Sequence, residues 1–469
     1  MPYAEQRGNK WRVKWNTGKK HPETGRWIYD GKSGFNSRDD AINYGLDRES
    51  DIRNQRYTSR RDGAISMREY SKTWQQTIDV GHLRKRSVES ISRLYIESYW
   101  GDTTLADIKA SAYRAWELWL KDQSQVGERY RGEILLVFSM MMDDAVEDGL
   151  RQASPVVKKK RRRGTYKKKP RERKRNMRIE DIHQLACNAL SFWGFPGYVY
   201  VWTFAMTGMR PAELYGLRPE YCHPQWPASD PLNDPTEEDR EERHEEDMER
   251  YGAALMPAIR VQWQHQRLEG VGEPGLYAPK YESRRTLVIP RFLAELLEML
   301  LSSRERESEW VFTSVNSGPL INANFPYFYW RKFADGREEK KEFERVRLGK
   351  RQTVPSWRPT PELLPVERWR GKRQYLVRHG HKEWLDEDGH SRIAAESRMG
   401  HELAGVEGLY SNVTPAMERA IMETLQARWE GFVLTLPDGW EPPRSPRALP
   451  VDLSQWMKLQ VEAAKAKKL

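Results

Sequence analysis

The sequence has little cysteine and no long apolar run. Its 469 residues include two cysteines, Cys187 and Cys222, which excludes a disulfide framework and a cysteine-rich zinc or iron–sulfur module. No stretch approaches the ~18 apolar residues of a transmembrane helix, and the first residues lack the apolar core of a signal peptide. We therefore expect a reduced, intracellular protein of about three domains, at ~150 residues for each domain.

The positive charge of the chain is concentrated in one segment. Residues 158–175 carry 13 Lys or Arg and one acid, so this segment has a charge of +12 and the rest of the chain −1. A run of this kind cannot bury a core, so we interpret it as a linker at residues 156–177. It is either a solubilising spacer or a strap along phosphates. As a strap, it would bind DNA through Lys158, Lys159, Lys160, Arg161, Arg162, Arg163, Lys167, Lys168 and Lys169.

The hydrophobic pattern predicts two small domains before this linker. Residues 10–36 alternate like strands, with Trp11, Val13 and Trp15 on one face, and Ser37 is placed to cap a helix that ends near Gln55. Residues 1–56 should therefore form a three-stranded sheet with one helix. Residues 57–155 show helical spacing throughout, which predicts four helices with their methionine run in the core.

After the linker, residues 178–436 mix helices with a few strands, and the predicted fold class is an α+β multidomain protein. The acidic stretch 230–249 should be a solvated loop or an exposed helix, and the Pro- and Arg-rich residues 351–372 a second long loop. In the tail, residues 437–469, an apolar stripe predicts a short helix. That helix docks either on its own domain or on a neighbouring protomer. The stripe consists of Leu453, Trp456, Met457 and Val461.

Four segments of the third domain carry groups suited to chemistry. Arg210 follows an apolar helix and a glycine, Lys280 lies in what should be half of a hairpin, near its turn, and Arg378 lies on a helix. In the last segment, His401 is followed nine residues later by Tyr410. Each residue alone has an ordinary interpretation, since a lone Arg usually forms an ion pair and a lone Tyr usually packs. Glu213 is the obvious partner for Arg210.

Together, the order and spacing of these segments resemble the tyrosine recombinase (phage integrase) family. The family motif T-G-x-R-x-x-E-L is present as Thr207, Gly208, Arg210, Glu213 and Leu214. The later motifs are H-x-x-R-H, then G-H, then a tyrosine nine residues on, and they match Arg378-His379, Gly400-His401 and Tyr410. The hairpin lysine of the family matches Lys280 in the segment that ends at Pro290. The resemblance covers nearly the whole chain and is weakest at the acidic insert and the tail.

One position departs from the family pattern. Tyr375 stands where the family usually has histidine, three residues before Arg378. We take activity to be retained and include Tyr375 among the catalytic positions. His379 should help to hold the helix, as the second histidine of the family motif does.

The resemblance implies a reaction without cofactor or metal. Tyr410 would attack a DNA phosphodiester and form a 3′-phosphotyrosyl bond, while Arg210 and Arg378 hold the charge of the pentacoordinate phosphate with bidentate hydrogen bonds. Lys280 would protonate the leaving 5′-oxygen. His401 would either donate to a phosphate oxygen or assist the Tyr410 proton. The implied layout is an arm-type DNA-binding domain (1–56), a core-binding domain (57–155) and a catalytic domain (178–436).

The resemblance also implies partners and leaves rival functions open. The implied function is a site-specific recombinase that integrates or excises a phage or mobile element, acting on double-stranded attachment sites as a tetramer. Further implied partners are a host DNA-bending protein and a directionality factor, and no membrane is implied. The implied location is the bacterial cytoplasm, in association with the nucleoid. The rivals are a type IB topoisomerase-like enzyme that relaxes DNA, and a non-catalytic, site-specific DNA-binding relative.

Overall fold

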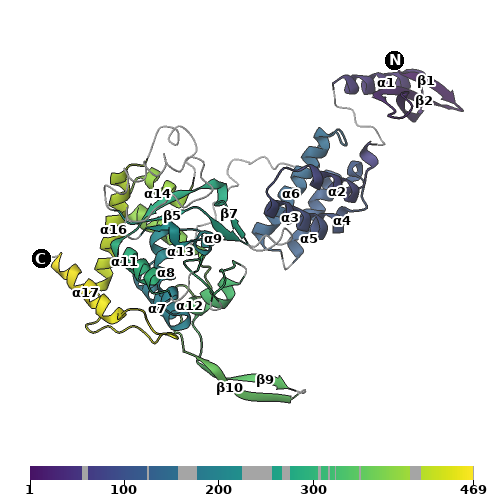
Figure 1. Cartoon of the computed structure of the whole chain (residues 1–469). Helices are drawn as coiled ribbons and strands as arrows, with labels where there is room; N and C mark the ends of the chain where they lie inside the picture. The colour runs from purple at the N-terminus through teal and green to yellow at the C-terminus, as the bar shows by residue number, and fades with distance from the viewer. Residues whose placement is uncertain are drawn as a thin grey trace, which may run out of the picture. The chain divides into compact units, whose positions relative to one another are not determined.

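A computed structural model of the chain describes residues 1–54, 62–123, 126–156, 177–223, 256–266, 275–304, 308–314, 317–322, 324–347, 350–401 and 413–467 (Figure 1). The chain divides into two compact units, residues 1–170 and 171–469. Among the described residues, no helix is long and apolar enough to cross a membrane.

The first unit begins with an antiparallel sheet of β1 (Tyr3–Arg7), β2 (Lys10–Lys20) and β3 (Trp27–Phe35), in the order β1-β2-β3. Helix α1 (Arg38–Arg53) packs on one face, where Val13, Trp15 and Ala41 form the core. The Ser37 side chain accepts a hydrogen bond from the Asp40 backbone N–H, so the predicted cap is confirmed. We did not predict β1, because this edge strand contains no fully buried residue and so lacks an apolar alternation.

The four helical segments predicted for the middle of the chain are present. They are α2 (Met67–Thr77), a continuous segment of α3 (His82–Ile91), π-helical η2 (Ser92–Ile96) and α4 (Glu97–Trp100), then α5 (Ala110–Asp122) and α6 (Glu128–Glu147). Short 3₁₀ turns lie at η1 (Asp62–Ala64) and η3 (Leu105–Asp107). The common core of the four helical segments includes Trp74, Trp116 and Phe138, together with Met141 and Met142. The methionine run is therefore core, as its helical spacing predicted.

The second unit is built around one apolar helix. Helix α8 (Phe195–Thr207) is buried along nearly its whole length, and α7 (Ile179–Trp193), α11 (Arg291–Ser302) and α13 (Tyr375–Glu387) pack against it. Within the described residues, the other helical elements of this unit are α9 (Pro211–Tyr215), η4 (Pro219–Tyr221), η7 (Lys280–Glu282), η8 (Pro326–Trp330), α12 (Arg331–Asp335), α14 (Arg392–Met399), α16 (Pro415–Val433) and α17 (Leu453–Ala466). The predicted fold class, α+β with a mainly helical third domain, is confirmed.

Four strands of this unit form an interrupted antiparallel hairpin, and a short fifth strand lies beside it. A sheet has the order β4-β5-β8, from β4 (Cys222–His223), β5 (Ala258–Val261) and β8 (Arg285–Val288), while β6 (Gln264–Gln266) pairs with β7 (Gly275–Tyr277). The segment of Lys280 is thus half of a hairpin, as predicted. The predicted position of Lys280 near the turn of the hairpin was wrong, because Lys280 lies between β7 and β8 and not between β6 and β7. Tyr281 and Glu282 have φ of 62° and 51°, which breaks the strand there.

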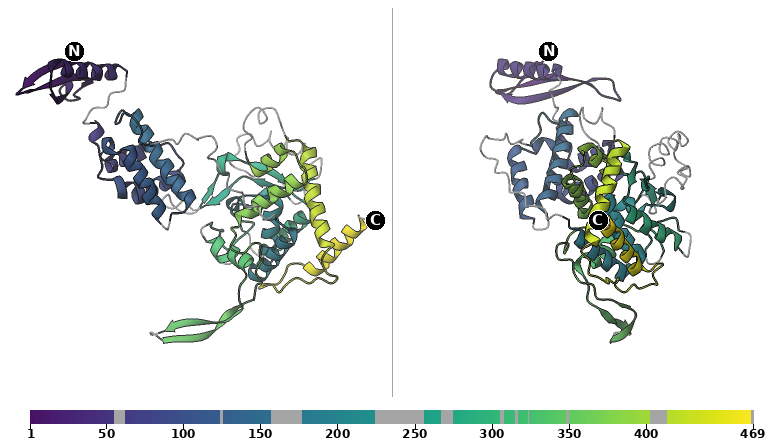
Figure 2. Two further views of the ribbon diagram at one scale, coloured as in Figure 1. Left: turned by 180° about the vertical axis from the view of Figure 1, so that it is seen from behind. Right: turned by 90° about the vertical axis from the view of Figure 1, so that its left-hand side faces the viewer.

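The long loop predicted at residues 351–372 was wrong over its first ten residues. Strand β10 (Lys350–Thr360) pairs with β9 (Lys340–Arg347), and the ribbon extends from the rest of its unit (Figure 2). Each strand of a two-stranded ribbon has a free edge, so Pro355 and Pro359 are tolerated despite lacking an N–H. The register shifts between Pro355 and Thr360.

The tail folds back on its own unit. Helix α17 begins after Asp452, whose side chain accepts from the Gln455 N–H, and packs along α16 (Figure 2). Leu453 and Met457 are buried, and Trp456 Nε1 donates to Glu295 Oε2 at 2.8 Å. Of the two dockings that the sequence left open, the single chain adopts the one on its own domain.

Candidate active site

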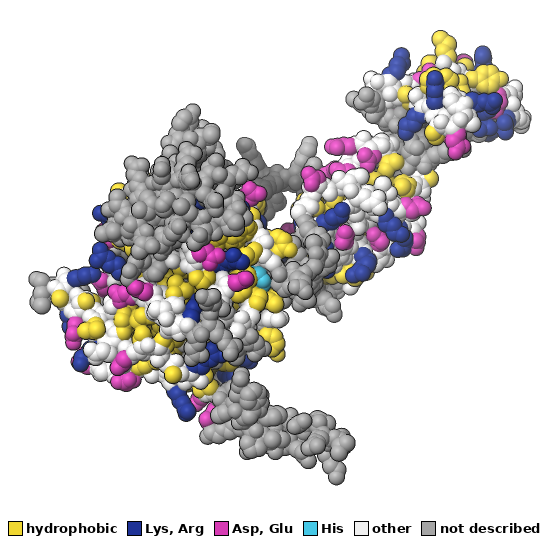
Figure 3. Space-filling view, in the orientation of Figure 1, with side chains coloured by type: hydrophobic (Ala, Val, Ile, Leu, Met, Phe, Trp, Pro, Cys, Tyr) yellow, Lys and Arg dark blue, Asp and Glu magenta, His cyan; other side chains and the backbone are white. Residues whose placement is uncertain are grey.

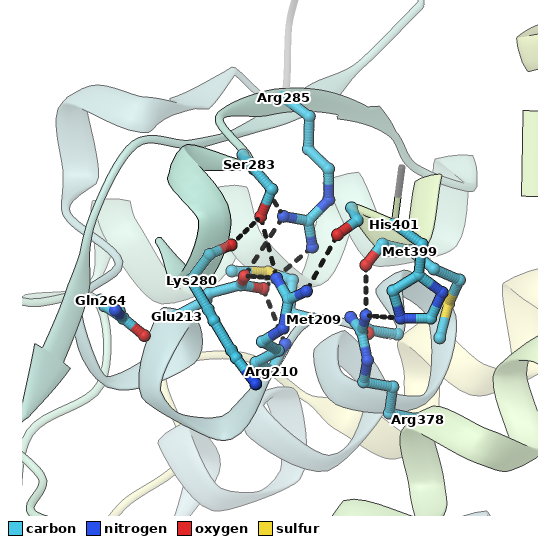
Figure 4. Close-up of polar contacts among 12 residues, drawn as sticks. Met209, Arg210, Glu213, Gln264, Lys280, Ser283, Arg285, Arg378, Met399 and His401 are labelled. Atoms are coloured by element: carbon cyan, nitrogen blue, oxygen red, sulfur yellow. Dashed lines mark hydrogen bonds and ion pairs between the residues drawn. The ribbon is translucent and has the colours of Figure 1, made fainter. Parts of the chain in front are cut away.

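Arg210 stands at a sharp junction between two helices. Helix α8 ends at Gly208, which has φ of 63°, and α9 begins at Pro211, whose fixed φ suits the first helical position. The Arg210 guanidinium donates to Glu213 Oε1 at 2.8 Å, to Ser283 Oγ at 2.9 Å and to the Gly400 carbonyl at 2.9 Å (Figure 4). The ordinary ion pair with Glu213 therefore exists, but it is one of three contacts that fix this guanidinium.

Glu213 is a fully buried carboxylate between two arginines. Arg285 of β8 donates to both of its oxygens, at 3.2 Å and 2.9 Å. Burial raises the pKa of Glu213, but the charge and hydrogen bonds of Arg285, and then of Arg210, outweigh burial and hold the pKa below its usual value. The carboxylate is therefore ionised and compensates part of the positive charge around it.

Arg378 enters the same cluster from the first turn of α13. Its Nη1 donates to the Gly208 carbonyl at 2.7 Å, and its Nη2 donates to the Met399 carbonyl and to His401 Nε2 at 3.1 Å. Burial, and after it the charge of Arg210, lower the pKa of Arg378 to about 10. The side chain remains a cation at neutral pH.

The C-terminal end of α14 organises three guanidinium groups. Its last carbonyls, at Arg398, Met399 and Gly400, accept from Arg285, Arg378 and Arg210 respectively. Helix C-termini carry unpaired carbonyls and a partial negative charge, which favours cations. The arginines are thus held in place by neutral backbone atoms. Among the described residues of this cluster, their three positive charges face one buried carboxylate, that of Glu213.

His401 follows directly on this helix end. Its side chain is 42% exposed, and Nδ1 lies 2.7 Å from Glu396 Oε2. The surroundings of Gly400 leave little room for a side chain, since a β-carbon there would lie 2.9 Å from Arg285 Nη1 and 3.0 Å from Ser283 Oγ. Glycine at this position, with φ of 63°, therefore brings His401 up to the arginines.

The buried histidine of α13 is His381, not His379. His381 Nδ1 donates to the Ala205 carbonyl at 2.9 Å, and its Nε2 accepts from Arg398 Nε at 3.0 Å. Burial, and then the charge of Arg398, hold the pKa of His381 well below its usual value. His381 therefore holds helix α13 in place, the role that was expected of His379. His379 is exposed, and the centre of its ring lies 5.2 Å from the centre of the Tyr375 ring.

Lys280 and Tyr375 lie at the border of this cluster. The Lys280 carbonyl accepts from Ser283 Oγ at 2.9 Å, which links its turn to Arg210 through Ser283 (Figure 4). The Lys280 side chain is exposed, and its ammonium lies 4.7 Å from the centre of the Tyr281 ring. Tyr375 is 41% exposed one turn before Arg378. The structure places both residues near the arginines without a direct hydrogen bond to them among the contacts described.

Several predicted residues fall outside the described part of the chain. These are Tyr410, the basic residues from Lys158 to Lys169, and the acidic stretch 230–249. Among the residues that are described, no three His, Cys, Asp or Glu side chains gather as a metal site would need. The site that the structure does show consists of Arg210, Glu213, Ser283, Arg285, Arg378, Glu396 and His401.

Sequence reasoning missed part of this set. Ser283 and Arg285 lie within the segment that matched the family's hairpin motif, and this match was the only signal for them. Glu396 and Arg398 gave no signal, because their roles depend on contacts between α13, α14 and β8 that no local pattern records.

Gly208 offers a test of how tightly these elements meet. A β-carbon there would lie 2.5 Å from His381 Cδ2, whereas at Gly389, with a similar φ of 72°, it would meet nothing within 4 Å. Gly389→Ala should lower the free energy of unfolding by about 1 kcal/mol, the cost of a left-handed alanine. Gly208→Ala should lower it by about 3 kcal/mol, because overpacking is added. Urea unfolding measures both, and equal losses would contradict the close packing of α8 on His381.

Comparison with known proteins gives matches only among solved structures. No family model and no curated protein matches the chain. A variant of the Tn1549 transposon integrase in complex with a circular intermediate DNA matches with a TM-score of 0.50 and 16% identity, over 77% of this chain and 99% of that chain. A second variant, in complex with transposon right end DNA, matches with a TM-score of 0.50 and 16% identity, over 76% and 99%. A lambda integrase tetramer bound to a Holliday junction matches with a TM-score of 0.45 and 11% identity, over 87% and 97%.

The two matches to the Tn1549 integrase show the fold of this chain. At 16% identity they concern architecture alone, and they cover nearly the whole of the integrase fragment. The chain therefore has the fold of a transposon integrase, with a cluster of three arginines and a histidine at the end of α14.

Proposed function

We propose that this chain is a tyrosine recombinase that cuts and rejoins DNA at specific sites through a 3′-phosphotyrosyl intermediate. The observation that carries the proposal is the convergence of Arg210, Arg378 and His401 at the end of α14, in a chain with an integrase fold. The integrase structures that share the fold are complexes with transposon DNA. By analogy, we assign double-stranded DNA as the substrate and a phage or mobile element as the setting.

The arginine cluster suits the transition state of phosphoryl transfer. As the nucleophile attacks, charge builds on the non-bridging oxygens, and preorganised donors in a site that excludes water stabilise it strongly. Guanidinium forks match these oxygens in a fixed geometry. Because backbone carbonyls and Glu213 already fix Arg210 and Arg378, little reorganisation is needed when a phosphate arrives.

The remaining groups move protons. In the proposed reaction, the Tyr410 oxygen forms a bond to phosphorus, the bond from phosphorus to the 5′-oxygen breaks, and the Tyr410 proton passes to a base. Lys280, as a titratable cation in the turn next to Ser283, protonates the leaving 5′-oxygen. A phenol is nearly all neutral at pH 7, so it needs such a base, and His401 is the exposed histidine of the cluster. We assign Tyr375 no direct step, since among the described contacts it makes no hydrogen bond to the arginines of the cluster and its ring lies against His379.

Trapping on DNA with a random core sequence tests this function against its rivals. A nick near the cleavage point lets the short 5′-hydroxyl strand leave, so covalent complexes accumulate and the captured DNA can be sequenced. A recombinase should enrich one core sequence and join two copies of it. Capture without sequence preference, together with relaxation of supercoiled plasmid, would indicate a topoisomerase instead. Specific binding without any covalent product would indicate the non-catalytic relative.

We further propose that the N-terminal sheet binds accessory, arm-type DNA sites. Val13 and Trp15 face α1, so Arg12, Lys14 and Asn16 lie on the opposite face of β2. Tyr3 and Tyr29, which are 64% and 60% exposed, pair in register with Lys14 and Asn16. Figure 3 shows Lys and Arg side chains together with hydrophobic ones on one face of this N-terminal part. Such a basic and aromatic surface suits DNA grooves, which admit β-ribbons.

Removing two charges from this face should weaken arm-site binding selectively. Arg12→Ala combined with Lys14→Ala should flatten the slope of log K against log salt by about 2 units if both residues contact phosphate, because each contact contributes about 0.9. Cleavage of the core site should stay within twofold. The matched control removes two exposed lysines of α17, Lys458 and Lys465, and should leave the slope unchanged. Equal slopes for the sheet variant and the control would reject the arm-binding surface.

A further inference from the structure

Glu396 connects His401 to a second charged side chain. The carboxylate of Glu396, on α14, bonds to Lys382 of α13 through Oε1 and lies 2.7 Å from His401 Nδ1 through Oε2. An ionised carboxylate only accepts hydrogen bonds, so Nδ1 carries the proton and donates it. On the other side of the ring, Arg378 Nη2 lies 3.1 Å from Nε2, and a guanidinium only donates. The neutral ring is therefore held in the Nδ1–H tautomer by partners on both sides.

The surroundings keep this carboxylate ionised and in place. Glu396 is 13% exposed, and burial raises its pKa, but hydrogen bonds from Lys382 and then His401 outweigh burial and lower the pKa. The backbone adds a second connection, since the His401 N–H donates to the Glu396 carbonyl at 3.0 Å. Among the described residues, the charged side chains that contact His401 are Glu396 on α14 and Arg378 on α13, and Lys382 of α13 contacts Glu396.

We propose that Glu396 is the positioning residue of His401 and fixes it as a proton acceptor toward the arginine cluster. The inference rests on the proposed recombinase function and decides between the two roles that the sequence left open for His401. With Nδ1–H committed to Glu396, Nε2 carries only its lone pair, which accepts from Arg378 Nη2 in this structure. When a phosphate takes that Arg378 N–H, the lone pair can take a proton from a nucleophile, and it cannot donate one to a phosphate. When Nε2 gains that proton, the ring becomes a cation whose charge the carboxylate compensates, as in other carboxylate–histidine pairs.

A double-mutant cycle tests this role. Glu396→Gln should slow DNA cleavage by about 10-fold or more, the scale of losing a carboxylate that orients a functional histidine, while the Kd for DNA stays within twofold. In a His401→Ala background, Glu396→Gln should have no further effect, because Glu396 acts only through His401. Lys382→Met is the matched control. It removes the other partner of Glu396 and leaves the contact with His401, so it should slow cleavage by less than threefold.

A spectroscopic measurement separates this inference from the proposed function. In protein labelled with ¹⁵N-histidine, the His401 signals, assigned by their loss in His401→Ala, should report the Nδ1–H tautomer in the wild type. In Glu396→Gln the signals should shift toward a tautomer mixture, because the amide can either accept or donate. Unchanged signals, or additive effects in the cycle, would overturn the inference. If the wild-type chain forms no covalent DNA complex, the recombinase proposal fails and the spectrum alone decides the role of Glu396.

Discussion

Tyr410→Phe should abolish covalent attachment to DNA and leave DNA binding nearly intact. The substitution removes only the phenolic oxygen, which in the proposed reaction forms the bond to phosphorus. Without it, no phosphotyrosyl bond can form, so the expected loss is complete and not partial. Denaturing gels of protein trapped on nicked DNA measure the covalent product, and gel shifts measure binding.

The matched control is Tyr375→Phe. Tyr375 is also a tyrosine of the second unit, 41% exposed and one turn from Arg378. Since it makes no direct hydrogen bond to the arginines among the contacts described, its hydroxyl should be dispensable and the covalent product should persist within about threefold. A covalent complex that survives Tyr410→Phe and disappears in Tyr375→Phe would exchange the two assignments.

Arg210→Lys and Arg378→Lys should each slow cleavage by about 100-fold or more. This is the scale of removing one preorganised donor from a charge that develops in the transition state. Lysine keeps the charge but loses the fork, so it cannot bind two oxygens at once. In the case of Arg378, it also cannot reach Gly208, Met399 and His401 together with fixed geometry. Single-turnover cleavage measures the effect.

Two comparisons make this prediction specific. Arg419→Lys changes an exposed arginine of α16 and should leave the cleavage rate unchanged. Because Arg210 and Arg378 are buried, thermal melting must show that their lysine variants remain folded. Folded variants that cleave within threefold of the wild type would remove the arginines from the proposed chemistry.

Local patterns predicted the helices of the first unit because their buried faces repeat with helical spacing. Trp74, Trp116 and Phe138 are buried as that spacing requires. Strands were harder to predict. β1 has no buried residue, and the prolines of β10 suggested a loop, although a ribbon with two free edges accepts them.

The candidate site could be predicted only where motifs marked it. Arg210, Arg378 and His401 were found through the order of three short segments, and the structure brings them together on the end of α14. Their supporting contacts had no such marker. Glu396 reaches His401 because α14 ends in a left-handed glycine, and His381 is buried in place of His379 because of where α8 crosses α13. Both outcomes depend on packing between elements distant in sequence.

The most direct measurement is to map the residue that carries DNA after trapping. The wild-type chain is incubated with a nicked DNA substrate, the covalent complex is digested with protease and nuclease, and the modified peptide is sequenced by mass spectrometry. The account predicts a nucleotide joined through its 3′-phosphate to Tyr410. Attachment to any other residue, or through a 5′-phosphate, would contradict the proposed active site.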